Sequence, residues 1–179
     1  MTLPSSRVYA VVLAFVRIVT GAMWLVHGVP KFTRSDAFMP PNGVFASYLQ
    51  NGLAKAGGPY HAFLAGVVAP NANLFAELVR LGEVLTGMVL VLGLFTRLGG
   101  LVGVLLPLNY MAARGALESA SGWGTVDASL ALLSAISLLL PTGRVLGLDG
   151  LFRRRAPRPV PVVAEFVPEP PLDGPTASR

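Results

Sequence analysis

The sequence predicts an all-α integral membrane protein, a four-helix bundle with short interfacial helices in its long first loop. Hydrophobic residues make up 53% of the 179-residue chain and charged residues only 13%, whereas a soluble domain is about one quarter charged. Four segments approach the roughly 20 apolar residues that a spanning helix needs. We therefore expect a membrane domain over residues 1–152 and a basic, then proline-rich tail over 153–179.

The four expected spans follow from apolar runs. The first, 8–29, is interpreted as an uncleaved membrane helix because no convincing signal-peptide cleavage site follows it. The second and third, 74–95 and 98–113, are separated by only a few residues, so they must form an antiparallel hairpin. The fourth, 126–140, is short and ends before a proline.

The long connection between the first two spans contains apolar residues at helical spacing, namely Val44, Phe45, Tyr48, Leu49 and Leu53. This pattern predicts a short helix that lies on the membrane surface or caps the bundle. The following "YHAFLAGVV" predicts a second short helix.

Basic residues predict the orientation, because cytoplasmic loops are enriched in lysine and arginine. Four spans place both termini on one side of the membrane. That side carries Arg7, Arg97, Arg144, Arg153, Arg154, Arg155 and Arg158, against Lys31, Arg34, Lys55 and Arg114 on the other. Both termini are therefore expected in the cytoplasm and the long loop outside.

Composition also excludes several functions. The chain has no cysteine, which removes disulfides and thiolate metal sites, and only two histidines in unlike contexts, so neither haem nor a metal is expected. The net charge of +5 is concentrated near the C-terminus after a membrane helix, which favours anionic lipid over nucleic acid. The sequence contains no motif of known catalytic specificity.

Three charges interrupt the second span, at Glu77, Arg80 and Glu83. Their spacing of three residues places them on one stripe of a helix. Because a charge at the bilayer centre costs on the order of 3 kcal/mol, such residues face the bundle interior and pair there. These three residues are the candidate catalytic groups.

A second polar stripe lies on the first span, at Arg17, Thr20, Trp24, His27 and Lys31. Counting helical rise from the expected membrane surfaces places Arg17 level with Glu83. We therefore expect Arg17 to pair with Glu83, and His27 or Lys31 to lie near Glu77.

Polar residues on the remaining spans complete a pocket that opens outward. Asn109 and Tyr110 come from the third span and Asp127 from the fourth. The candidate ligand-binding residues are Arg17, Trp24, His27, Lys31, Asn109, Tyr110 and Asp127. Two readings stay open, because the same charges could bind a ligand or could only hold the helices in register.

These segments resemble the DoxX-like family of membrane proteins. "RIVTGAMWLVHGVPKF" is similar to the start of that family, "AELVRLGEVLTGMVLVLGLFTRLGGLVG" to its second and third helices, and "GRVLGLDGLF" to its closing stretch. The resemblance covers roughly residues 10 to 152. The long first loop and the "GE…GLFTR" pattern are most similar to the DoxD branch.

The resemblance implies a four-helix protein of the bacterial inner membrane, the membrane subunit of a thiosulfate:quinone oxidoreductase. It implies electron transfer from thiosulfate to a bound quinone, in company with a separate DoxA-like protein. In that reading Arg80 and His27 attract the anion or hydrogen-bond a quinone carbonyl, and Glu77 or Glu83 handles protons.

Two other functions remain open. The chain could be a non-catalytic accessory subunit of a larger redox, photosynthetic or respiratory membrane complex, with the tail contacting a partner. A small-solute or proton carrier is the third reading, and four short spans without a visible repeat make it the weakest.

Overall fold

The computed structural model describes residues 6–151, and every regular element in that range is helical. Four long helices form its body: α1 (Ser6–Thr33), α5 (Ala72–Leu92), α6 (Thr96–Ala113) and α7 (Val126–Leu139). Each contains or nearly matches one expected span, so the all-α prediction is confirmed. The predicted tail over 153–179 lies outside the described residues.

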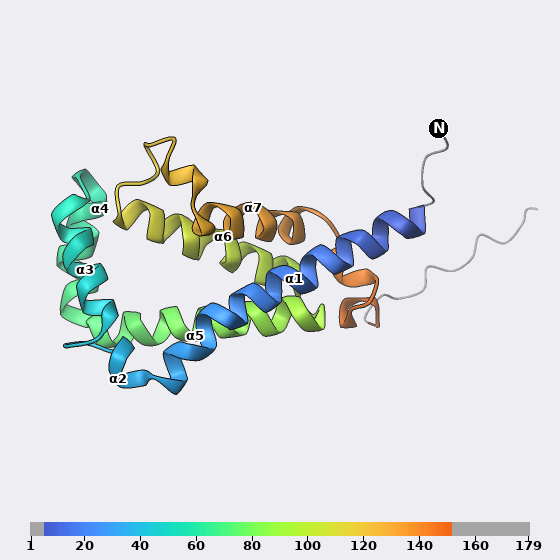
Figure 1. Cartoon of the computed structure of the whole chain (residues 1–179), viewed down its shortest axis with the longest axis horizontal. Coiled ribbons are helices and arrows are strands. Elements are labelled where there is room, and N and C mark those ends of the chain that lie inside the picture. The colour runs from blue at the N-terminus through green and yellow to red at the C-terminus, as the bar shows by residue number, and fades with distance from the viewer. Residues whose placement is uncertain (1–5, 152–179) are drawn as a thin grey trace, which may run out of the picture.

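The four helices pack as two close pairs, α1 with α5 and α6 with α7, which also meet across the bundle (Figure 1). A tight turn joins α5 to α6 in the expected antiparallel hairpin. Short 3₁₀ turns at Gly122–Gly124, Thr142–Arg144 and Leu148–Gly150 complete the described chain.

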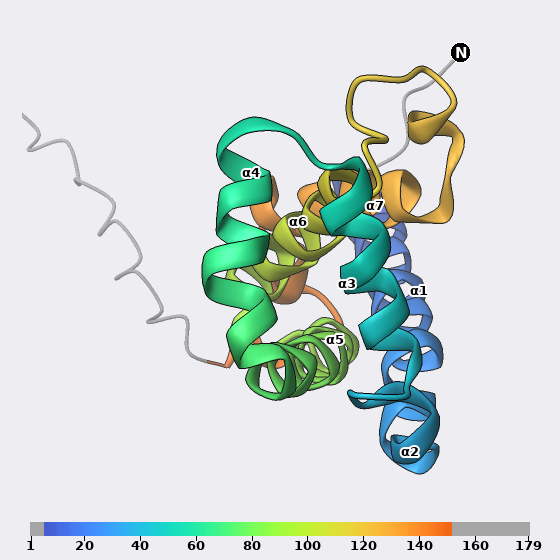
Figure 2. The same cartoon turned by 90° about the vertical axis from the view of Figure 1, so that its left-hand side faces the viewer.

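The long first loop folds into a helical cap over one end of the bundle (Figures 1 and 2). It contains α2 (Ser35–Phe38), α3 (Val44–Lys55) and α4 (Gly58–Phe63). A π-helical turn at Leu64–Val68 and a 3₁₀ turn at Ala69–Asn71 then lead into α5. The two short helices predicted in this loop are therefore present, and we call this the capped end of the bundle.

A glycine contact sets the register of α1 against α5. A Cβ atom added to Gly21 would lie 2.7 Å from the backbone nitrogen of Val91 and 2.8 Å from the carbonyl oxygen of Gly87. The two backbones therefore approach more closely than any side chain allows at this position. This contact determines which charges of the two helices lie at the same level.

We expect Gly21→Ala to destabilise the protein by about 1–3 kcal/mol, because its methyl group must push two helix backbones apart. The measurement is thermal unfolding in detergent. Gly66→Ala is the matched control, since a Cβ atom there meets nothing within 4 Å. Equal unfolding temperatures for the two variants would contradict the assigned register.

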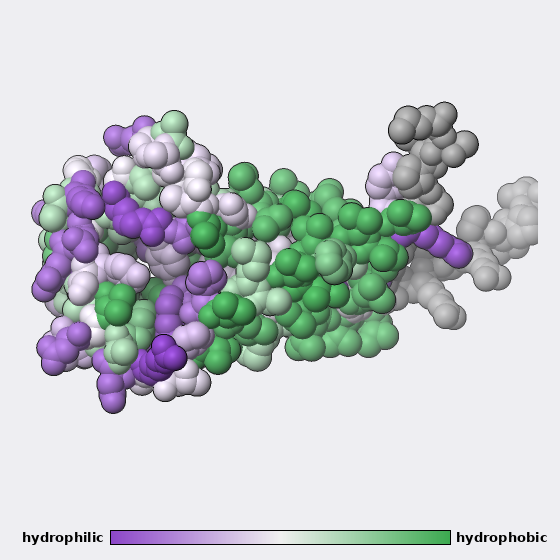
Figure 3. Space-filling view, viewed as in Figure 1, coloured by the Kyte–Doolittle hydropathy of each residue, from purple (hydrophilic) through white to green (hydrophobic). Residues whose placement is uncertain are grey.

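On the face shown in Figure 3, apolar side chains cover the helices beyond the capped end, whereas hydrophilic residues gather over the cap. By length and composition alone, α1 is the one helix of the described part that qualifies to cross a membrane. The three charges of α5 and the 14-residue length of α7 set those helices apart from α1.

Candidate functional site

A cavity of about 410 Å³ lies inside the capped end, between α1, α2, α3, α5, α6 and α7. Its apolar wall is largely aromatic and consists of Trp24, Phe38, Phe45, Tyr48, Val79, Ala113 and Leu130. Its polar groups are His27, Lys31, Asn51, Lys55, Glu83, Tyr110, Arg114 and Asp127. Clefts of this size with a few converging polar groups are typical of small-molecule sites.

A carboxylate at the centre of the polar wall joins α1, α5 and α6. Glu83 is only 2% exposed, and its Oε1 atom pairs with the ammonium group of Lys31. The Tyr110 hydroxyl donates a hydrogen bond to the same oxygen, at 2.8 Å. The other oxygen, Oε2, is buried and has no hydrogen-bond partner among residues 6–151. One oxygen of the carboxylate is therefore bound by protein donors, and the other has no protein donor within the described residues.

Aromatic rings hold Lys31 in this position. Its Nζ atom lies 5.1 Å from the ring centre of Phe38 and 5.8 Å from that of Tyr110. Cation–π attraction therefore adds to the ion pair with Glu83. Because Phe38 belongs to α2, the cap contributes directly to the arrangement of charges in the cavity.

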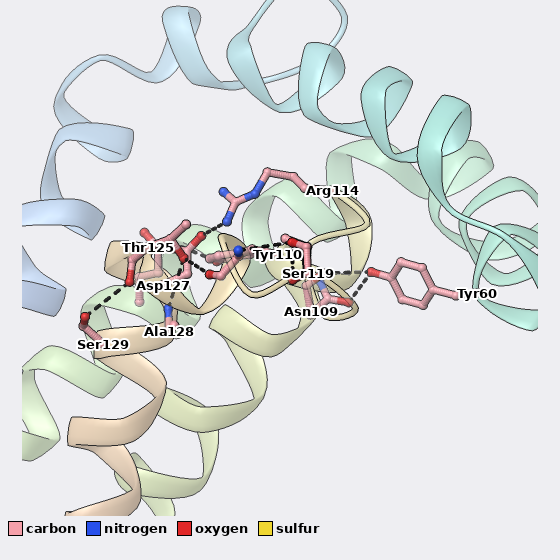
Figure 4. Close-up of polar contacts among 12 residues, drawn as sticks. Tyr60, Asn109, Tyr110, Arg114, Ser119, Thr125, Asp127, Ala128 and Ser129 are labelled. Carbon is pink, nitrogen blue, oxygen red and sulfur yellow. Dashed lines mark hydrogen bonds and ion pairs between the residues drawn. The ribbon is translucent and has the colours of Figure 1, made fainter.

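A second ion pair stands where the cavity reaches the surface. Arg114 reaches from the end of α6 toward Asp127 at the start of α7, and the two pair (Figure 4). The Arg114 side chain is 43% exposed and that of Asp127 20%. His27 and Lys55 also combine an exposed position with a place in the cavity lining. The mouth therefore carries an excess of basic groups.

Trp24 forms the floor of the cavity, and core packing and a hydrogen bond hold its side chain in place. Its ring is 1% exposed and packs with Leu90 and Leu130. Its Nε1 atom donates to the hydroxyl of Ser134, at 3.1 Å. This indole is therefore a fixed surface rather than a mobile side chain.

Asn109 lies outside the cavity lining and serves the cap instead. The Tyr60 hydroxyl donates to the Asn109 side-chain oxygen at 2.7 Å and to its carbonyl oxygen at 3.1 Å (Figure 4). Burial raises the pKa of the Tyr60 phenol, which keeps its proton available for these bonds. This pair attaches α4 to α6.

The predicted stripe on α5 separates into two parts. Arg80 pairs with Glu77 on its own helix and donates to the Ser35 hydroxyl at 3.1 Å. The Arg80 guanidinium lies 4.5 Å from the ring centre of Phe32. Glu77 and Arg80 therefore attach α5 to the α1–α2 corner, outside the cavity lining, whereas Glu83 faces into the cavity.

The predicted pair between Arg17 and Glu83 is wrong, because Glu83 pairs with Lys31. Glu77 pairs with Arg80 on its own helix. The prediction assumed that the antiparallel spans 8–29 and 74–95 extend between the same two membrane surfaces. The Gly21 contact instead shifts α1 along α5, so that Arg17 lies beside Gly93, beyond the end of α5.

Arg17 lies apart from the cavity, at the end of the bundle away from the cap, where it takes part in a second polar network. It is fully buried, and its Nη2 atom donates to the carbonyl oxygen of Leu146 at 2.6 Å. Gly93 adopts a left-handed φ of 66°, and a Cβ atom there would collide with the Arg17 guanidinium. The turn after α5 therefore requires glycine.

Asp149 belongs to the same polar network as Arg17 and was not among the predicted site residues. Its Oδ1 atom accepts from the Phe95 backbone N–H at 2.7 Å, and its Oδ2 atom from the Thr96 N–H and hydroxyl at 3.1 and 2.6 Å. Its own N–H donates to the Gly93 carbonyl at 2.8 Å. Asp149 thus caps the start of α6, where unpaired N–H groups favour a carboxylate.

The prediction also missed the contribution of α3 to the cavity. Phe45, Tyr48, Asn51 and Lys55 all line it from that helix. The available signal was the helical spacing that predicted α3, because a cap over a bundle presents one of its faces inward. Of the ten predicted residues, the lining includes Trp24, His27, Lys31, Glu83, Tyr110 and Asp127.

Comparisons with known proteins give one finding. Neither the comparison with curated proteins nor that with solved structures gives a match. A family model described as "TQO small subunit DoxD" matches residues 12–160, which includes all four long helices almost completely, the cap and the Arg17–Asp149 region. Since this match covers most of the chain, the protein belongs to the DoxD family.

Proposed function

We propose that this chain is the membrane subunit of a thiosulfate:quinone oxidoreductase and that its cavity binds the quinone ring. The observation that carries the proposal is the buried Glu83 carboxylate, which faces an aromatic-walled cavity with one unpartnered oxygen. The family description, the small subunit of TQO, supports the same reading.

The proposal treats all four long helices as membrane spans. Large apolar side chains are exposed on each of them, for example Phe15 on α1, Leu85 on α5, Leu105 on α6 and Leu132 on α7. With both termini in the cytoplasm of a bacterial cell, the capped end faces outward, as the distribution of basic residues favours.

The cavity suits a quinone in shape and in hydrogen bonding. A quinone ring is flat and apolar, with two carbonyl oxygens that accept hydrogen bonds, and it supplies a two-electron acceptor. The rings of Phe45 and Tyr48 offer stacking surfaces. Lys31 and Tyr110 are donors within the same wall, and Glu83 beside them can hold a proton.

The basic mouth suits the second substrate. Lys55 and Arg114 are exposed there, and a doubly charged anion such as thiosulfate is attracted to a concave surface with this excess of positive charge. Because the chain has no cysteine, thiol chemistry cannot carry the electrons within it. Electrons then pass directly between the two ligands or through a partner such as a DoxA-like protein.

An accessory role in a larger membrane complex is the second candidate. The hydrogen bonds of Asp149 at one end of the bundle and the Tyr60–Asn109 pair at the other favour it, because a bundle stabilised at both ends can serve as a scaffold. In that case the cavity charges hold helices in register and no quinone is bound.

The two tryptophans provide the test, because Trp24 lies in the cavity wall and Trp123 on the exposed α6–α7 loop. In Trp123→Phe the remaining indole reports on the cavity. We expect a soluble quinone analogue to quench its fluorescence saturably, since quinones quench indoles that they contact. Trp24→Phe is the matched control, in which quenching should stay linear and weak.

A saturable response in Trp123→Phe alone, together with quinone that copurifies from the membrane, supports the enzyme. Linear quenching in both variants contradicts the quinone site and favours the accessory role. Thiosulfate-dependent reduction of the analogue, with the DoxA-like partner added, then tests the substrate.

A further inference from the structure

We propose that Glu83 exchanges protons with the aqueous phase at the capped end of the bundle and with no other side. The proposal begins from its two unlike oxygens. Oε1 is held by Lys31 and Tyr110, whereas Oε2 is buried and free of partners within the described residues. A buried carboxylate oxygen with no protein donor is the position at which a proton or a water molecule binds.

The route toward the capped end is polar and wide enough for water. The cavity volume of about 410 Å³ accommodates on the order of ten water molecules. The charged and titratable groups that line it with Glu83 are His27, Lys31, Lys55, Tyr110, Arg114 and Asp127. Three of these, His27, Lys55 and Arg114, are exposed, so the polar lining reaches the protein surface at the capped end.

The opposite direction is closed by apolar packing. The floor of the cavity consists of Trp24 and Leu130, with Leu90 behind them and Met23 and Leu106 packed against the cluster. All three core side chains are at most 3% exposed. A proton that moves on toward the Arg17 end must cross this layer.

No titratable side chain lies below that layer until the far end of the bundle. The segments 18–26, 84–92, 98–109 and 128–139 of the four helices contain none. Thr20 donates to the carbonyl oxygen of Val16 and Ser134 accepts from Trp24, whereas the buried Ser137 hydroxyl has no partner within the described residues. A hydroxyl is not an ionisable relay group, so these residues do not extend the chain of titratable side chains. Intramembrane proton relays are built from chains of ionisable groups, and here the chain stops at Glu83.

The sidedness of Glu83 has a consequence for turnover, which rests on the proposed function. Oxidation of two thiosulfate ions to tetrathionate forms one S–S bond and releases two electrons but no protons. Reduction of a quinone to a quinol takes up those two electrons and two protons. Both protons must therefore come from water. Because Glu83 exchanges protons only with the aqueous phase at the capped end, both are taken up from that side.

The test uses proteoliposomes that hold the full-length chain in one orientation. Because the chain has no cysteine, Ala120→Cys on the exposed α6–α7 loop can be labelled with a membrane-impermeant biotin maleimide to sort the vesicles. The pH is then changed rapidly on one side, and the infrared carboxyl band that disappears in Glu83→Gln is followed. Glu118→Gln, which removes an exposed carboxyl of the same loop, is the matched control for band assignment.

We expect the Glu83 band to respond to a pH change at the capped end at least an order of magnitude faster than to one at the other end. Equal rates, a faster response from the other end, or no response to either would overturn the proposal. If Glu83→Gln fails to fold, Glu83→Gln combined with Lys31→Met removes the unpaired ammonium and assigns the band instead.

A second readout separates this proposal from the proposed function. With quinone, thiosulfate and the partner present, a pH dye should report alkalinisation at the capped end, with two protons taken up per quinol formed. If the Glu83 band responds only from the capped end but there is no turnover, the proposed enzyme function is contradicted and one-sided proton exchange is supported. If there is turnover but alkalinisation appears at the other end, the enzyme function is supported and one-sided exchange from the capped end is overturned.

Discussion

Glu83→Gln is expected to lower kcat/KM for quinone reduction by on the order of a hundredfold or more. The glutamine keeps the size of the side chain, and its carbonyl oxygen still accepts the hydrogen bond from Tyr110. It cannot hold a proton for transfer, and it no longer pairs with Lys31. The measurement is steady-state reduction of a soluble quinone by purified protein with its partner.

Folding should survive this change, because the Lys31 side chain is 22% exposed and can turn its ammonium group toward the water of the cavity. Glu118→Gln should keep the wild-type rate, since its carboxyl lies in an exposed loop. Retention of the wild-type rate by Glu83→Gln would refute the assigned role.

Glu77→Gln decides between the two parts of the α5 stripe. The sequence predicted one catalytic stripe, and the structure divides it between the cavity and the α1–α2 corner. If the site is the cavity, Glu77→Gln loses only the pair with Arg80 and turnover falls much less than in Glu83→Gln. A larger loss in Glu77→Gln than in Glu83→Gln would place the chemistry at the corner instead.

The helices of this protein were predictable because membrane-like segments must satisfy their backbone hydrogen bonds internally. A long apolar run therefore has few alternatives to a helix. The same argument gave the α5–α6 hairpin, because too few residues lie between Leu92 and Thr96 for any other connection. Even α3 followed from its spacing of apolar residues.

The pairing of charges was not predictable, because it depends on how far one helix slides along another. The close approach at Gly21 fixes that offset. Glycines are frequent in such helices, and the sequence does not reveal which of them meets a neighbouring backbone. Because the predicted offset was wrong by a few helical turns, Arg17 was predicted as the partner of Glu83, whereas the structure has Lys31 there.

The role of Asp149 was hidden for a related reason. Its carboxylate serves Phe95 and Thr96, more than 50 residues earlier in the chain. Sequence reasoning looks for the cap of a helix in the residues just before it. Here the residue at that position, Phe95, has a left-handed φ of 50° and provides no side-chain cap, so the carboxylate comes from elsewhere.

Asp149→Ala should therefore destabilise the protein by about 1–3 kcal/mol, the usual cost of leaving buried hydrogen-bonding groups without their partner. The change leaves the N–H groups of Phe95 and Thr96 without their acceptor. It also removes the carboxylate that attracts the buried Arg17 guanidinium, two of whose nitrogens already lack partners within residues 6–151. Thermal unfolding in detergent measures the effect.

Asp149→Asn separates charge from hydrogen bonding in this network. Its amide keeps one acceptor but turns a donor toward either the Phe95 N–H or the Thr96 groups, so we expect a loss close to that of alanine. Asp36→Asn, at an exposed position in α2, is the matched control and should unfold at the wild-type temperature. If Asp149→Asn is as stable as that control, Asp149 acts through neither its charge nor its second oxygen, and the network does not hold this end of the bundle.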